Sequence, residues 1–247
     1  MKIYLAGAGG KPWLKDNFFD FYRLDSYEYL KKGCSAELKF LNTYKDFILD
    51  SGIFSYLNGK DCSNMDWEKY ITEYGNFVIN NNISKYVEVD IDSIIGLDLT
   101  EILRKKLEKL VGRKSIPVWH INRGYDKWLE ICRDYDYICF GAFITDGLKK
   151  EKYYMIKKFL QSAQHNSCKV HGLGFTNFEW LKKLKFYSVD SSSWTIGSRY
   201  GTLSIYQGDK VKNLNRPKGS RIKNMHKLSS HNFYEWVKYQ KWADVNL

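Results

Sequence analysis

The sequence predicts an α/β protein, built as a (β/α)8 TIM-type barrel. The first observation is that short apolar segments alternate with amphipathic helical segments along most of the 247 residues. The second is that eight such segments can be counted as parallel strands joined by crossovers, and a closed ring of strands leaves no exposed edge. The third is that no Pro/Gly/Ser-rich linker divides the chain, so we expect 1–247 to be a single domain. An open doubly wound sheet is the alternative.

Each expected strand is short and apolar, and a turn or an amphipathic helix follows it. The expected strands are 2–6, 47–49, 86–90, 115–120, 137–140, 170–171, 186–189 and 203–206. The expected helices are 67–78, 99–110, 126–132 and 149–163, with a closing helix around 233–237 that Ser229 or Ser230 would cap.

The segment 170–194, VHGLGFTNFEWLKKLKFYSVDSSSW, brings two strand ends close together in the sequence. Gly172 to Gly174 predict a turn at which a ligand can approach bare backbone. Thr176 and Glu179 have capping-box spacing for a short helix. The second strand then delivers Asp190 at its carboxyl end, followed by three serines.

Polar residues end most of the predicted strands. They are Asp50, Asp90, His120, Gly141, His171 and Asp190. In (β/α)8 enzymes the carboxyl ends of the strands carry the chemistry, so three acids on one rim predict an active site. The alternative is that these acids only cap helices.

Composition favours a nucleic-acid partner. Lys and Arg exceed Asp and Glu by 39 to 28, a net charge of +11, and 17% of the residues are aromatic. Proteins that bind phosphates with cations and stack aromatic rings on bases have this combination of positive charge and aromatic content. Lysine-rich helices that only face solvent are the alternative source of the charge. The five cysteines form no CxxC pair, so we expect reduced thiols, no metal site and no cofactor. Without a signal segment or membrane-length apolar run, we expect a soluble, cytoplasmic protein.

Three acids on a basic, aromatic surface predict substitution at a sugar carbon. One carboxylate would act as the nucleophile while another group moves the proton.

The order of the motifs resembles that of the tRNA-guanine transglycosylases. DSGIFS at 50–55 resembles the family's DSGGFQ, and VEVDID at 87–92 stands where the family has a second aspartate. CFGAF at 139–143 is similar to IGGLAV, and HGLGFT with SVDSSSW resembles GVGTP and the nucleophile strand. The resemblance covers about residues 45–197.

The short chain and the SVDSSSW form look most similar to the phage and bacterial DpdA-like branch, which exchanges guanine in DNA for a 7-deazaguanine such as preQ0. A phage-encoded protein of this kind would act in the host cytoplasm. The resemblance implies a (β/α)8 barrel. The CxCxxC-plus-His zinc cluster of the tRNA enzymes is absent after Asp190, so the zinc-binding subdomain is expected to be lacking and tRNA is the weaker substrate.

The resemblance also implies roles for individual residues. Asp190 would be the nucleophile that forms a covalent glycosyl intermediate, and Asp50 the proton-transfer acid and base. Asp90 would accept hydrogen bonds from guanine, and Asp92 competes for this role because both point to one strand face. Further substrate contacts are expected from Ser51, Gly52, Phe54, His120, Asn122, Gly141, Ala142, Phe143, His171, Gly172 and Gly174. Among these, the amides of Gly141 and Ala142 would donate to the purine carbonyl, and Phe54 and Phe143 would sandwich the ring.

The segment 210–227, KVKNLNRPKGSRIKNMHK, contains seven cations and no acid. They are Lys210, Lys212, Arg216, Lys218, Arg221, Lys223 and Lys227. This pattern predicts a clamp on a phosphate backbone, with a solvated loop as the alternative. The expected partners are therefore DNA and a free 7-deazaguanine base, while the oligomeric state is open. A nucleoside or glycoside hydrolase and a non-enzymatic DNA-binding protein are the competing functions.

Overall fold

The structure is a computed structural model that describes residues 1–9, 11, 20–33, 38–53, 65–141, 149 and 152–247. The strands are β1 (Lys2–Ala6), β2 (Tyr22–Ser26), β3 (Asp46–Asp50), β4 (Val118–Trp119), β5 (Tyr137–Phe140), β6 (Lys169–Gly172), β7 (Ser188–Ser191), β8 (Leu203–Tyr206) and β9 (Val211–Leu214). The α-helices are α1 (Tyr27–Leu30), α4 (Trp67–Asn80), α5 (Asp92–Ile95), α6 (Leu97–Val111), α7 (Gly124–Asp134), α8 (Tyr153–His165), α9 (Phe178–Leu181), α10 (Ile196–Tyr200) and α11 (Met225–Asn246). The 3-10 turns are η2 (Leu41–Thr43), η3 (Ile121–Arg123) and η5 (Ser193–Thr195).

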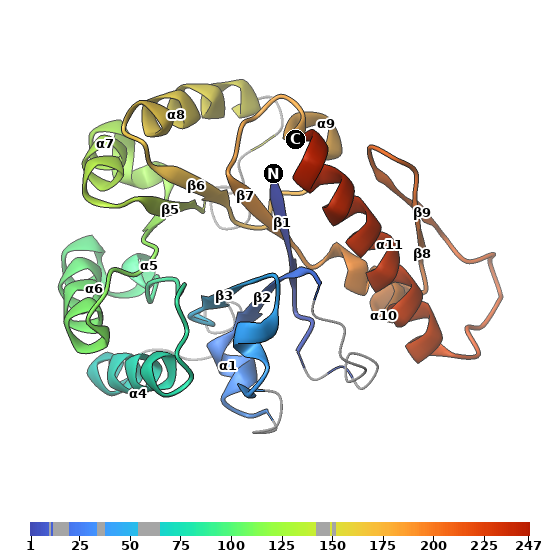
Figure 1. The fold of residues 1–247 in the computed structure, drawn as a ribbon, viewed down its shortest axis with the longest axis horizontal. Coiled ribbons are helices and arrows are strands. Elements are labelled where there is room, and N and C mark those ends of the chain that lie inside the picture. Colours follow the sequence, from blue (N-terminus) through green and yellow to red (C-terminus); the bar gives the residue numbers. More distant parts are fainter. Residues whose placement is uncertain (10, 12–19, 34–37, 54–64, 142–148, 150–151) are drawn as a thin grey trace.

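Seven of these strands form one parallel sheet in the order β3-β2-β1-β7-β6-β5-β4. Figure 1 shows the sheet curling through the middle of the molecule, with α4, α6, α7, α8 and α11 around its outside. The predicted α/β class and the parallel pairing are confirmed. The described residues form a curled seven-stranded sheet, and not a closed barrel of eight regular strands.

The predicted strand 86–90 is reduced to single bridges, from Leu49 to Tyr86 and from Val87 to Ile116. The physical reason is Glu88, a fully buried carboxylate in the middle of the segment. Its Oε1 accepts the backbone N–H of Val118 at 2.5 Å, so this amide is bonded to a side chain. The regular ladder is therefore interrupted, although the bridges still span the gap between β3 and β4.

Strand β2 lies between β1 and β3 and was not predicted. Its sequence, YRLDS, places Arg23 and Asp25 where an apolar strand would have hydrophobic residues. Both side chains are buried and form an ion pair, and the second oxygen of Asp25 accepts the N–H of Gly9 at 3.3 Å. A pattern of isolated charges cannot show that two of them neutralise each other inside the fold.

The predicted eighth strand, 203–206, is a strand but does not belong to the sheet. It is β8, which pairs antiparallel with β9 in a separate hairpin packed against α11 (Figure 1). The position that it would occupy beside β1 is taken by β7, because β1 already pairs with β2 and β7.

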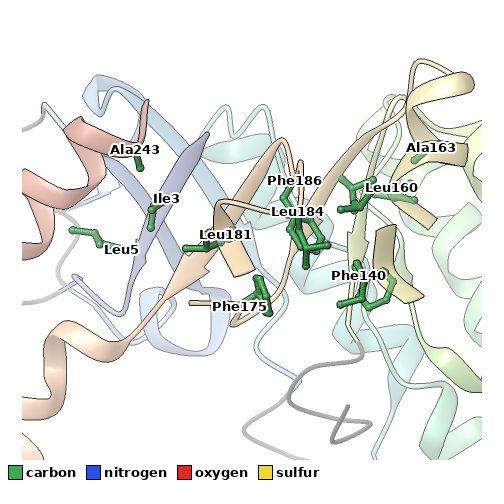
Figure 2. Packing of buried hydrophobic residues seen from close by; sticks show 14 of the residues in the cluster. Ile3, Leu5, Phe140, Leu160, Ala163, Phe175, Leu181, Leu184, Phe186 and Ala243 are labelled. Atoms are coloured by element: carbon green, nitrogen blue, oxygen red, sulfur yellow. The ribbon is translucent and has the colours of Figure 1, made fainter. Parts of the chain in front are cut away.

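Alternate residues of the strands enter different hydrophobic clusters, three of which are formed by the described residues, as expected from the two-residue period of a strand. The larger core lies between the sheet and the outer helices, and Figure 2 shows Ile3 and Leu5 of β1 beside Ala243 of α11. Tyr4, between them in sequence, belongs to a smaller cluster on the other face. That cluster consists of Tyr4, Tyr22, Leu24, Ile48, Val87, Ile116, Val118 and Cys139.

Two predicted helix caps are wrong. Helix α9 is capped by Asn177, whose side chain accepts the N–H of Trp180 at 3.2 Å, and not by Thr176. Helix α11 begins several residues earlier than the predicted caps, with Asn224 accepting the N–H of Lys227 at 2.9 Å. In each case an Asn side chain, which caps as well as Ser or Thr, stands at the observed start.

Candidate active site

Three acids converge at the carboxyl ends of the strands. Asp50 is the last residue of β3, Asp190 lies one residue before the end of β7, and Asp90 follows the bridged segment 86–89. The negative charges of Asp190 and Asp90 both contribute to the raised pKa of Asp50, so the three carboxyls are close enough to repel one another. The rim expected from the sequence is therefore assembled.

Asp190 is held by donors that reach one of its two oxygens. Its Oδ1 accepts the N–H of Gly174 at 2.7 Å and lies 3.2 Å from Nε2 of His171. The other nitrogen of His171, Nδ1, lies 2.7 Å from the hydroxyl of Ser188, which is 2.5 Å from the hydroxyl of Tyr137. The four side chains form one continuous chain of hydrogen bonds.

The carboxylate at its end fixes the direction of this chain. A carboxylate can only accept, so Nε2 of His171 carries the proton and Nδ1 accepts from Ser188. The hydroxyl of Ser188 then donates to Nδ1 of His171 and accepts from the hydroxyl of Tyr137. Burial raises the pKa of Tyr137 well above its ordinary value, which keeps this phenol a donor. The buried relay therefore orients the carboxylate of Asp190.

The second oxygen of Asp190, Oδ2, has no hydrogen-bond partner among the residues that the structure describes. The side chain keeps 12% of its surface exposed, whereas that of His171 is fully buried. One oxygen is thus anchored, and the other is free of hydrogen bonds from the described residues. This is the geometry that a carboxylate nucleophile needs.

Asp50 has a different environment. Burial raises its pKa to about 6, the N–H of Gly52 at 2.9 Å from Oδ2 opposes the rise, and the charges of Asp190 and Asp90 add to it. A carboxyl with this pKa can donate and recover a proton near neutral pH, as a general acid and base must.

The turn after Asp50 requires glycine. Gly52 has φ +84°, and a Cβ there would lie 2.6 Å from the hydroxyl of Ser26. Ser51 is buried, and its carbonyl accepts the hydroxyl of Tyr70 on α4 at 2.6 Å. Ser51 and Gly52 therefore shape the loop that holds Asp50 in place.

Asp90, Asp92 and His120 form a second group on the rim, joined by Arg123. The carboxylate of Asp90 lies 2.6 Å from Nε2 of His120 and accepts from Arg123 Nη2 at 3.0 Å. Arg123 Nε donates to Asp92 at 2.8 Å. Asp90 and Asp92, which were predicted to compete for one role, are both held by the guanidinium of Arg123.

The same three residues could contribute metal ligands, since one ligand atom from each lies within 4.8 Å of the others. The buried guanidinium of Arg123 already forms an ion pair with each of the two carboxylates. A divalent cation would have to bind beside this fixed positive charge, so the donor set fits a metal poorly.

Two glycines expected to face the substrate are engaged within the protein. The N–H of Gly141 is donated to the carbonyl of Trp119 at 2.9 Å, so this one amide is already hydrogen-bonded within the protein. Gly141 instead supports His120, because a Cβ at this position would lie 2.7 Å from the ring. The N–H of Gly174 is donated to Asp190.

The remaining residues that were expected to contact the substrate lie at different places in the fold. A Cβ at Gly172 would lie 3.2 Å from the ring of Phe186 and 3.3 Å from the Cβ of Phe175, and Asn122 is exposed on η3. Phe54, Ala142 and Phe143 lie outside the described residues.

Sequence reasoning missed Arg123, Ser188 and Tyr137. Arg123 directly follows the predicted Asn122, and a cation this close to a rim of acids was the available signal. Ser188 lies two residues before Asp190, on the same strand face, and could also have been found. Tyr137 carried no such signal, because it lies on β5, far along the chain from the strands β6 and β7 that carry His171 and Ser188.

The seven predicted phosphate-binding cations are all exposed, and none forms an ion pair with an acid in the described part of the chain. Lys210 and Lys212 belong to the β8–β9 hairpin, and Lys227 lies in the first turn of α11. The remaining four lie between these two elements, at 216–223. The charge is therefore free to meet an external anion.

No family model matches the chain, and a search of curated proteins finds no match either. In the part of the chain that the structure describes, no helix combines the length and apolarity needed to cross a membrane.

Proposed function

We propose that this protein is a DNA-guanine transglycosylase, which exchanges guanine in DNA for a 7-deazaguanine base such as preQ0. The observation that supports this most is the contrast between two acids on one rim. Asp190 has one oxygen anchored and one open, while Asp50 has a pKa raised to about 6. Environments that separate two carboxyls in this way assign one as nucleophile and the other as acid.

In the first half-reaction, Oδ2 of Asp190 attacks C1′ of the deoxyribose and the bond from C1′ to N9 of guanine breaks. The bonding electrons leave with the base, and the protonated Asp50 gives it a proton. The products are a glycosyl ester on Asp190, neutral guanine and an ionised Asp50.

The second half-reaction reverses these steps with a new base. Asp50 takes the proton from N9 of the incoming 7-deazaguanine, and this nitrogen attacks C1′. The ester bond breaks and returns its electrons to Asp190, so both carboxyls regain their starting states. No metal or redox cofactor enters the proposed sequence.

Asp90 is proposed to recognise the base. Each of its oxygens is fixed by one cationic or imidazole group, Arg123 or His120, and each keeps a further lone pair. Those lone pairs can accept from the N1–H and the exocyclic amine of guanine, groups that 7-deazaguanines retain. Asp92 would act through Arg123.

The finer fold belongs to the same proposal. The bridges from Leu49 to Tyr86 and from Val87 to Ile116 would complete a ring of eight parallel segments, giving an irregular (β/α)8 barrel in one domain, without a zinc-binding subdomain. The segment 210–227 would clamp the DNA backbone outside this ring. DNA is proposed over tRNA because the zinc cluster of the tRNA enzymes is absent after Asp190.

A nucleoside or glycoside hydrolase is the second candidate, because Asp50 could activate water as readily as it activates a base. Incubation with labelled guanine and duplex DNA separates the candidates. Incorporation of label supports exchange, and release of guanine without incorporation supports hydrolysis. Binding without either reaction would leave a non-enzymatic DNA-binding protein and overturn the proposal.

A further inference from the structure

A hollow beside the candidate active site has no role in the proposed reaction. It has a volume of about 170 Å³ and is lined by Ser192, Ser193, Thr195, Ile196, Arg199 and Tyr200. Building on the proposed function, we propose that this hollow binds the DNA strand next to the exchanged nucleotide. Arg199 would hold a backbone phosphate, and Tyr200 would stack on a neighbouring base.

The hollow is close to the proposed nucleophile. Ser192 follows Asp190 by two residues, so their Cα atoms are at most about 7.6 Å apart, given 3.8 Å for each step of the chain. Helix α10, which carries Arg199 and Tyr200, follows β7 through a single turn, η5 (Figure 1). A deoxyribose on Asp190 therefore has its phosphates within reach of this hollow.

The lining groups suit a nucleic-acid strand. Arg199 is exposed and forms no ion pair with any described residue, and serine hydroxyls stand beside it. Guanidinium and hydroxyl groups are the usual donors to phosphate oxygens. Tyr200 is 72% exposed, so its ring is accessible to an external partner. Exposed rings next to cations are how proteins bind unpaired strands without reading their sequence.

The hollow is also joined to the basic segment 210–227. Gly201, directly after Tyr200, has φ +70°, and a Cβ there would lie 2.5 Å from Ile222 and 3.2 Å from the side chain of Arg216. Thr202 donates to Asn215 at 3.3 Å. The basic segment therefore packs against the chain that leaves the hollow.

The test measures binding, without any need for turnover. A short fluorescein-labelled single-stranded DNA is titrated with wild-type protein, Arg199→Gln, Tyr200→Ala and the control Arg133→Gln, at several salt concentrations. Arg133 is an exposed arginine on α7, on the opposite side of the molecule (Figure 1), and has no ion pair among the described residues.

We expect Arg199→Gln to lower the salt slope by about 0.7, the value for one phosphate contact on a single strand. Tyr200→Ala should weaken binding about tenfold, the loss of one stacked base. Arg133→Gln should match wild type. Unchanged affinity and slope in both hollow variants would overturn the inference, as would an equal loss in the control. Preference for RNA of the same sequence would contradict DNA as the occupant.

Failure of the proposed function would look different. If the hollow variants lose affinity but wild type exchanges no guanine, the strand site stands and the transglycosylase proposal fails. If wild type exchanges guanine and the hollow variants bind normally, the reverse conclusion follows.

Discussion

The raised pKa of Asp50 predicts that the free energy of unfolding changes with pH. Replacing Asp50 should remove this change. An unfolded chain ionises this carboxyl near 3.8, whereas the folded protein holds its pKa at about 6. The folded state therefore binds more protons between these two pH values. Its free energy of unfolding should fall as pH rises through this window and stay lower above it.

The magnitude follows from the pKa. At 1.36 kcal/mol per pKa unit, the loss is at most about 3 kcal/mol, and partial exposure of the side chain makes it smaller. Asp50→Asn removes the titrating group, while its amide oxygen can still accept the N–H of Gly52. We therefore expect the variant to gain stability relative to wild type between pH 4 and pH 8, by up to about 3 kcal/mol.

Urea unfolding at a series of pH values measures this difference. Asp136→Asn is the matched control, because Asp136 is exposed and its side chain has no partner among the described residues. A stability difference between Asp50→Asn and wild type that is the same at every pH would refute the burial and repulsion assigned to Asp50. An equal pH effect in the control would do the same.

Four further changes test other parts of the account. Asp190→Asn should abolish exchange while DNA affinity, measured by anisotropy, changes little; substantial turnover would reject Asp190 as nucleophile. Gly141→Ala should push the ring of His120 away from Asp90. The KM for the base should then rise about tenfold, which is the order of one hydrogen bond to a charged group. An unchanged KM would show that His120 has no part in base binding. Replacing Arg216, Lys218 and Arg221 with Gln should lower the salt slope for duplex DNA by about 2.7, at roughly 0.9 per phosphate, for every sequence tested; an unchanged slope would mean that the segment is not a clamp. Extensive chelation should leave exchange intact, and loss of activity restored by a divalent ion would instead implicate the Asp90, Asp92 and His120 group.

The sequence predicted the parts of the fold that depend on local patterns. The apolar stripe on α4 and the acids at the ends of the strands follow from residue spacing alone, and the structure contains both. The number of regular strands did not follow, because it depends on three buried charged residues. The ion pair of Arg23 with Asp25 makes a strand out of a polar sequence, and Glu88 interrupts a strand in an apolar one.

The candidate site was predictable in its acids and not in their partners. Asp50 stands two residues before the turn glycine Gly52, and Asp190 ends an apolar run and is followed by three serines, so both signals lie within a few residues. Their supporting groups come from elsewhere in the chain: Tyr137 reaches Asp190 through Ser188 and His171. Such contacts depend on how the strands are ordered in the sheet, which no short motif contains.

A covalent adduct between Asp190 and DNA tests the central claim most directly. Wild-type protein is incubated with guanine-containing DNA without any free base, denatured, digested, and its peptides are weighed by mass spectrometry. We expect a deoxyribosyl ester on the peptide that contains Asp190, absent from Asp190→Asn and lost when free 7-deazaguanine is added. Guanine release by wild type without any adduct, or an adduct on a different residue, would contradict the account.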